Sequence, residues 1–166
     1  LSPKALFSKD IRYIIPTFQR PYVWDQEEQW EPLWDDVRNT AERYMDELDK
    51  LGEDRAAEAE RSTPSHFLGA VVLQQQQTAV VEVEQRTVID GQQRLTTLQL
   101  LLDAAQEVLE DIGQKPEARR LSKLVRNDED LVDSQPDYEF KVWPTRVDRE
   151  PFRHAMTNGL SVTDFQ

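Results

Sequence analysis

The sequence contains no cysteine among its 166 residues. A disulfide framework, a cysteine-ligated zinc site and thiol chemistry are therefore excluded, and the composition fits a reducing compartment. Apolar runs are short as well: the longest, such as residues 70–73, fall far below the ~20 residues that span a bilayer. We therefore expect a cytoplasmic protein with no membrane partner.

Histidine and glycine are also scarce. The two histidines, His66 and His154, do not have a metal-binding spacing, and His66 before an apolar stretch fits a hydrogen-bonded strand end better than a catalytic base. The five glycines form neither a Walker P-loop nor a dinucleotide fingerprint. The chain starts at Leu1 without a signal region and ends soon after an expected helix, so we expect a piece of a longer protein.

Positive charge is the remaining deficit, because the formal net charge is −12. Non-specific coating of nucleic acid needs clustered Lys and Arg and is therefore disfavoured. The charge is uneven, however. Residues 1–24 carry four bases against one acid, whereas residues 25–61 carry 14 acids against five bases. A basic, aromatic edge thus adjoins an acidic helix.

Hydrophobic periodicity predicts an α+β domain. Residues 52–65 have almost no large apolar side chain, so we expect a solvated helix extension followed by a mobile loop. We expect residues 1–166 to form a single domain, with this segment as a mobile insert. The expected strands are a short one ending at Pro16, residues 67–75 and 80–90 as a hairpin turning near 76–78, and residues 140–143. The expected helices are residues 31–51, with Asp25 as a candidate cap, and residues 92–112, 117–125 and 148–156.

The junction at residues 88–98, VIDGQQRLTTL, carries the clearest chemical signal. A strand ends, a glycine turns and a helix begins, so backbone N–H groups and the positive end of the helix dipole converge where an anion can bind. Alternatively, Asp90 and Gln93 form a capping box that needs no ligand. The first turn holds no acid, and Arg94 there is unfavourable unless an anion joins it. The residues favour an anion site and leave capping open.

Three segments resemble the signature blocks of a known family: IPTFQRPYVW at residues 15–24, FLG at 67–69 and IDGQQRLTT at 89–97. They are similar to the GmrSD-type N-terminal domain family, the DGQQR family of bacterial restriction and anti-phage proteins, and are closest in kind to phosphorothioate-dependent defence proteins of the SspE type. A weaker block, VWPT followed by DR at 148–149, comes later. Phe18 departs from the family, which usually has tyrosine there.

The resemblance implies a ParB/sulfiredoxin-like fold, a small mixed sheet with flanking helices, that binds and hydrolyses a nucleoside triphosphate (GTP or ATP) with Mg²⁺. It also implies modified DNA and a separate C-terminal HNH-type nuclease domain as partners; a homo-oligomer is left open. The expected catalytic residues are Asp90, Gln93 and Arg94, with Asp90 also holding the metal. The expected nucleotide-binding residues are Gln19, Arg20, Gly91, Gln92 and Thr96.

The aromatic loop at residues 18–24 is the expected DNA sensor, with Phe18, Arg20, Pro21, Tyr22 and Trp24 as its contacts. A proline and aromatic cup with one arginine nearby suits the soft sulfur of a phosphorothioate. Two alternatives stay open: Trp24 plugs the core, and Arg20 forms a surface salt bridge. The sequence thus predicts an NTP-hydrolysing sensor of a restriction protein, or alternatively a non-enzymatic ParB-like DNA-binding or interaction module.

Overall fold

The computed structural model describes residues 2–77, 83–132 and 135–158. They fall into two compact units, Leu1–Tyr22 with Ala70–Gln166, and Val23–Gly69. The first unit carries the sheet and the junction at residues 90–94, and the second is helical and acidic. Among the described residues, no helix combines the length and apolarity that crossing a bilayer requires.

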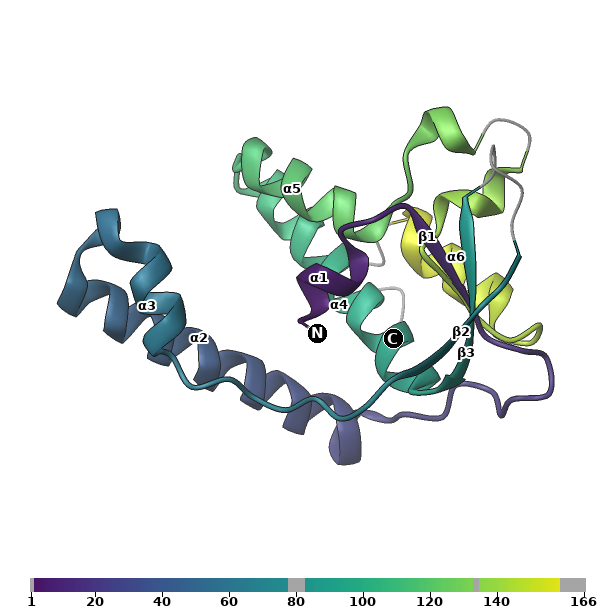
Figure 1. Ribbon diagram of the computed structural model, residues 1–166, viewed down its shortest axis with the longest axis horizontal. Coiled ribbons are helices and arrows are strands. Elements are labelled where there is room, and N and C mark those ends of the chain that lie inside the picture. The colour runs from purple at the N-terminus through teal and green to yellow at the C-terminus, as the bar shows by residue number, and fades with distance from the viewer. Residues whose placement is uncertain (1, 78–82, 133–134, 159–166) are drawn as a thin grey trace. The chain divides into compact units, whose positions relative to one another are not determined.

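A four-stranded sheet organises the first unit, in the order β2-β3-β1-β4. β1 (Ile11–Ile14) is parallel to both β3 (Glu84–Asp90) and β4 (Val142–Trp143), whereas β2 (Val72–Gln75) is antiparallel to β3. Figure 1 shows α4 (Gln92–Asp111) running beside this sheet. The expected hairpin and the mixed sheet of an α+β fold are confirmed, although residues 78–82, which include the end of the expected turn and the start of the expected second strand, lie outside the described ones.

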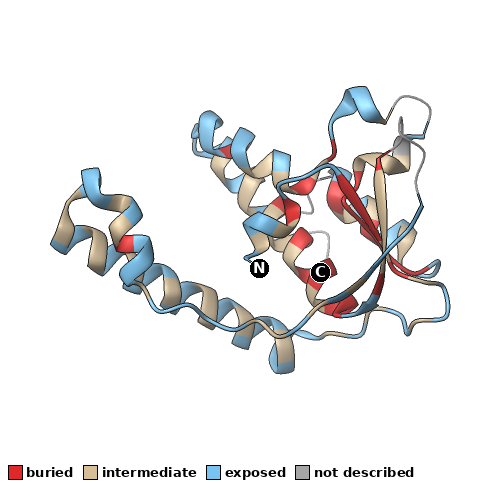
Figure 2. Ribbon diagram, viewed as in Figure 1, coloured by how far each residue is buried: buried red, intermediate tan, exposed pale blue. Residues whose placement is uncertain are grey.

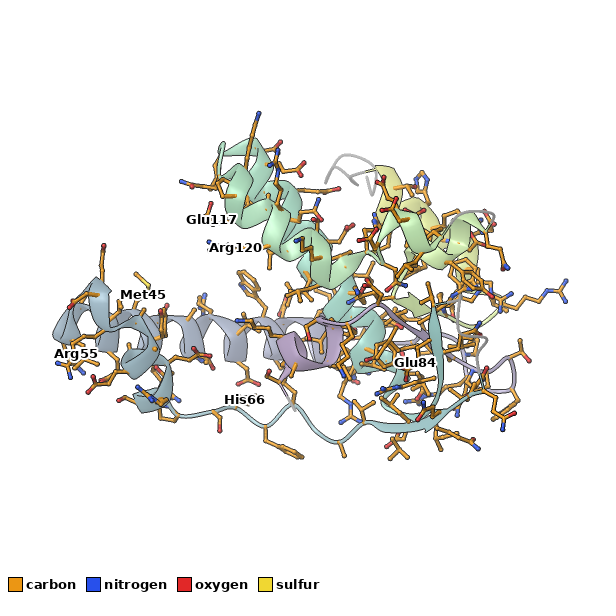
Figure 3. All side chains as sticks on the ribbon, turned by 45° about the horizontal axis from the view of Figure 1, so that its top comes forward. Met45, Arg55, His66, Glu84, Glu117 and Arg120 are labelled. Atoms are coloured by element: carbon orange, nitrogen blue, oxygen red, sulfur yellow. The ribbon has the colours of Figure 1, made fainter. Side chains whose placement is uncertain are left out.

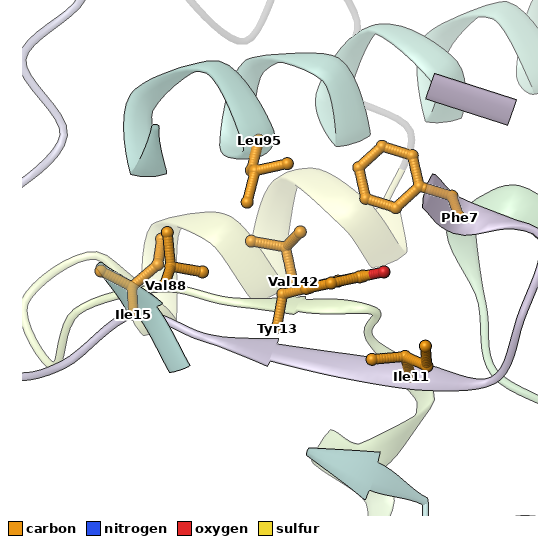
Figure 4. Packing of buried hydrophobic residues seen from close by; sticks show 7 residues of the cluster. All are labelled: Phe7, Ile11, Tyr13, Ile15, Val88, Leu95 and Val142. Atoms are coloured by element: carbon orange, nitrogen blue, oxygen red, sulfur yellow. The ribbon is translucent and has the colours of Figure 1, made fainter. Parts of the chain in front are cut away.

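Alternation along the strands places one face of the sheet against α4. Val88 of β3 and Val142 of β4 are fully buried there, and Leu95 of α4 packs onto them. Tyr13 of β1 is also fully buried and donates its hydroxyl to Leu6 O at 2.7 Å. Figure 4 shows this cluster between strands and helix, and the red segments of Figure 2 gather at the same place.

Shorter helices complete the first unit. α1 (Pro3–Phe7), which the sequence did not predict, is capped by Ser2 and buries Phe7 in the core. α5 (Lys115–Val125) packs on α4. α6 (Arg149–Asn158) begins directly after Asp148, and its Phe152 packs edge-on against Phe140 at 5.8 Å. These last two helices match the predicted positions to within two residues.

The second unit is built on α2 (Glu31–Leu51). Asp25 accepts the N–H of Glu28 at 2.8 Å and caps a π-helical turn, Gln26–Trp30, so the regular helix starts at Glu31 as expected. None of its residues is fully buried, and Met45 is 52% exposed (Figure 3). His66 finds its partner in this unit, with Nε2 3.2 Å from Asp36 Oδ2.

Residues 52–65 differ in part from the expectation. Gly52, at φ +95°, ends α2, and a 3-10 turn leads into a separate helix, α3 (Ala56–Ser62), instead of an extension of α2. Ala59 is fully buried within this unit. The mobility of the insert stays a prediction. The strand expected over residues 67–75 is confined to Val72–Gln75.

Candidate functional site

Gly91 makes the turn from β3 into α4. Its φ of +94° lies in the left-handed region that favours glycine. A Cβ at this position would lie 2.9 Å from Val71 Cγ2 and 3.2 Å from the carbonyl oxygen of Ala70. Both the backbone conformation and the crowding therefore require glycine at this position, and the turn packs closely against residues 70–71, just before β2.

The start of α4 has no side-chain cap, which overturns the capping-box alternative. The N-cap is Gly91 itself, because Asp90 lies one residue too early. Among the described residues, the backbone N–H that the Asp90 carboxylate accepts is that of the adjacent Gly91, at 2.8 Å. Gln93, the other member of the expected capping box, donates its side-chain amide to Pro21 O in the loop after β1. No acidic residue lies in the first turn. The positive end of the helix is thus left without a protein carboxylate in the capping position.

Asp90 and Arg94 form the charged part of the junction. Asp90 ends β3 and Arg94 lies in the first turn of α4, with Arg94 Nη2 3.9 Å from Asp90 Oδ2. The Asp90 side chain is 65% exposed and that of Arg94 is 28% exposed. At this distance the pair is a loose ion pair that leaves the carboxylate accessible, so an incoming anion and a cation can each find a partner here.

The two glutamines are buried and reach the loop that follows β1. Gln92 donates from Nε2 to Gln19 Oε1 at 3.3 Å, and Gln19 in turn donates to Ile89 O at 3.1 Å. Gln93 donates from Nε2 to Pro21 O at 3.0 Å. The segments at residues 15–24 and 89–97, more than 60 residues apart in sequence, are therefore joined directly. This junction explains why buried glutamines open the helix.

Tyr22 fastens the far end of the same loop. Its hydroxyl lies 2.6 Å from Thr97 Oγ1, and its backbone N–H donates to Asp148 Oδ2 at 3.0 Å. Asp148 also receives the hydroxyl of Thr145. Sequence reasoning missed Thr97 and Thr145 and treated Asp148 only as a helix cap. The available signals were the IDGQQRLTT block, which contains Thr97, and the VWPT and DR block, which contains Thr145 and Asp148.

Other loop residues face solvent. Phe18 is 82% exposed, and Arg20 and Pro21 are exposed as well. Phe18 therefore does not plug the core. Arg20 makes no ion pair with a described residue of its own unit. Trp24 is half-buried and belongs to the second unit, so the structure does not place it with the other predicted DNA contacts.

Thr96 is buried on the next turn of α4 and donates its hydroxyl to Gln92 O at 3.0 Å. Of the predicted nucleotide-binding residues, Gln19, Gly91, Gln92 and Thr96 lie together at the start of α4. Arg20 is exposed on the loop. Within residues 2–77, 83–132 and 135–158, no group of three or more potential metal-ligating side chains forms. Asp90 is therefore a single candidate ligand.

The fold and the site together define a class of domain. It is a mixed α+β domain in which a helix starts without a side-chain cap, carries an arginine in its first turn, and is hydrogen-bonded to a loop that follows the first strand. The model of the GmrSD restriction endonuclease N-terminal domain matches residues 4–163. The chain belongs to this family, as its signature segments predicted, and this gives it a role in DNA restriction. No curated protein matches the chain.

Proposed function

We propose that this domain binds and hydrolyses a nucleoside triphosphate, GTP or ATP, at residues 90–94. The observation that carries the proposal is the start of α4, where no side chain caps the helix, no acidic residue lies in the first turn, and Arg94 lies 3.9 Å from the exposed carboxylate of Asp90. A triphosphate there would accept hydrogen bonds from backbone N–H groups and would neutralise the charge of the Arg94 guanidinium. Membership of a restriction family supports the assignment, because such systems must be controlled before DNA is cut.

The residues of the junction divide the work in this proposal. Gly91 lets the phosphates approach the backbone, and Arg94 balances the charge that develops on the transferred group. Gln92 and Gln93 are positioning residues, since their amide nitrogens hold the loop. Gln19 belongs with them, and Arg20 is the exposed cation that would close over the phosphates from the loop.

Mg²⁺ fits this donor set as a shared ion. It is commonly bound by one or two carboxylates together with substrate phosphates and water. Asp90 supplies one exposed carboxylate oxygen pair, with one oxygen already accepting the Gly91 N–H. The ion would neutralise phosphate charge, while Asp90 would hold it at the end of β3.

We further propose that the loop at residues 16–22 senses modified DNA. Phe18, Arg20 and Pro21 are its exposed members, and an apolar ring, a proline edge and one cation suit a phosphorothioate better than an ordinary phosphate. Because the loop is hydrogen-bonded to Gln92 and Gln93, DNA binding would reach the nucleotide directly. A C-terminal HNH-type nuclease domain of the same protein would then cut.

One observation favours a second candidate, a non-enzymatic ParB-like DNA-binding or interaction module. Both glutamines of the junction already have structural partners in the loop, so the DGQQR turn would serve only to hold it. In that case the exposed ring of Phe18 would contact DNA or a partner protein, and no nucleotide would be needed.

Equilibrium binding of a fluorescent, non-hydrolysable GTP or ATP analogue with Mg²⁺ separates the two candidates. Arg94→Ala should weaken binding at least ~10-fold, because one charge-assisted contact is lost. Arg120→Ala is the matched control, an exposed arginine on α5. Equal binding by both variants, or no binding by the native chain, favours the module. A titration with phosphorothioate and plain duplexes at matched salt tests sensing, and equal affinities would reject it.

A further inference from the structure

A cavity of about 290 Å³ lies beside the first turns of α4. Three separate segments line it: the loop after β1, α4 and the start of α6. The residues that matter are Tyr22, Thr96, Leu100, Asp148, Phe152 and Ala155. Its volume is at the small end of ligand sites, which suits one flat ring system and not a whole nucleotide.

The lining combines apolar walls with two polar groups. The rings of Tyr22 and Phe152 and the side chains of Leu100 and Ala155 supply the apolar surface. Tyr22 is held rigidly, because both its hydroxyl and its backbone N–H are hydrogen-bonded. A preformed aromatic wall binds a planar ligand without the cost of ordering it.

Asp148 is the polar group that defines the ligand. Its Oδ2 accepts from Tyr22 N–H and from Thr145, whereas Oδ1 has no hydrogen bond to any described residue. A carboxylate that lines a largely apolar cavity favours a ligand with a hydrogen-bond donor, such as the N–H of a planar ring, since a ligand without a donor would leave the acceptor unpaired. Thr96 donates its proton to Gln92 O and so offers only lone pairs to the cavity.

We propose that this cavity binds a nucleobase, stacked on aromatic surface and donating an N–H to Asp148 Oδ1. The inference deepens the proposed function, and the assignment of the base to a bound nucleotide rests on that function. The cavity lies near the proposed phosphate site, because Thr96 lies one helical turn beyond Gln92, the first residue of α4. A base in the cavity would leave its phosphates to extend toward residues 90–94. An unpaired base of DNA has the same chemistry and is the other source.

The test uses nucleosides, which carry no phosphate, and follows the methyl signals of Thr96 and Leu100 by NMR. Adenosine, guanosine or cytidine should shift both signals saturably at millimolar concentration. Ala155→Leu fills the cavity and should weaken this binding at least ~10-fold. Ala104→Leu makes the same change at an exposed position of α4 and should leave it unchanged. Absence of saturable shifts, or equal shifts in both variants, overturns the inference.

A second variant guards against misfolding of Ala155→Leu. Asp148→Asn keeps an oxygen for Tyr22 N–H but replaces the free acceptor by a donor, so the order of nucleoside affinities should change. An unchanged order counts against the inference. Inorganic triphosphate separates this test from the proposed function. If triphosphate binds but nucleosides cause no shifts, the cavity proposal alone is rejected. If nucleosides bind but triphosphate does not, the phosphate site alone is rejected. Comparing a free triphosphate with a single-stranded oligonucleotide identifies the source of the base.

Discussion

The hydroxyls of Tyr22 and Thr97 lie 2.6 Å apart, although 75 residues separate them in sequence. This contact fastens the aromatic loop to the second turn of α4, beyond the two glutamine bonds at its first turn. The loop and the DGQQR helix therefore form one hydrogen-bonded assembly, through which the proposed DNA contact would be coupled to the proposed nucleotide site.

Removal of that hydroxyl tests the coupling. Tyr22→Phe keeps the ring but loses the bond to Thr97, which should lower the free energy of unfolding by about 1 kcal/mol. If the loop transmits DNA binding, stimulation of hydrolysis by modified DNA should fall much further than basal turnover measured at saturating nucleotide. Tyr44→Phe, on α2 in the second unit, is the control. Full stimulation in Tyr22→Phe would show that the contact carries no signal.

Gly91 and Gly113 give a matched pair for the cost of the turn. Both have positive φ, +94° and +80°, but a Cβ at Gly113 meets nothing within 4 Å. Gly113→Ala should therefore cost about 1 kcal/mol, from backbone strain alone. Gly91→Ala should cost distinctly more in urea unfolding, because it also collides with Val71. Equal losses would mean that the strand segment yields freely.

Asp103 makes stability depend on pH. Burial raises the pKa of this carboxyl to about 6, against the opposing effect of Arg126, whose Nη2 lies 3.5 Å away. The folded state thus holds the proton more tightly than the unfolded state, whose pKa is about 3.9, so stability is lost as pH rises from about 4 to about 6. The loss is at most about 3 kcal/mol for this shift.

Asp103→Asn isolates this effect, because it cannot titrate. The difference in unfolding free energy between the native chain and the variant should shift in favour of the variant between pH 4 and pH 7. Urea titrations at both values measure it. A difference that does not change with pH would contradict the raised pKa.

Much of the framework was predictable from sequence. The periodicity of α2 and α4, the hairpin of β2 and β3 and the glycine turn at residue 91 were all expected, because local pattern and backbone chemistry determine them. The capping box was wrong because a cap depends on one residue of register, and Gly91 occupies the position assigned to Asp90.

The remaining features depend on partners distant in sequence. Lys141 is fully buried in the first unit, where its amine donates to Lys9 O at 2.7 Å and to Asn127 Oδ1 at 3.2 Å. Nothing in a local pattern indicates such a lysine, since burial of a charge requires acceptors from other segments. The contacts of Tyr22 with Thr97 and Asp148 were missed for the same reason.

Phosphate release by the purified chain with GTP or ATP and Mg²⁺ tests the central claim most directly. The native chain should turn over, and Arg94→Ala should lower the rate at least ~100-fold with little change in melting temperature, because the guanidinium is proposed to balance transition-state charge and its ion pair with Asp90 is loose. Asp90→Asn should lower the Mg²⁺-dependent rate and leave the fold intact. Turnover that both variants retain in full, or a native chain that releases no phosphate with either nucleotide, would contradict the account.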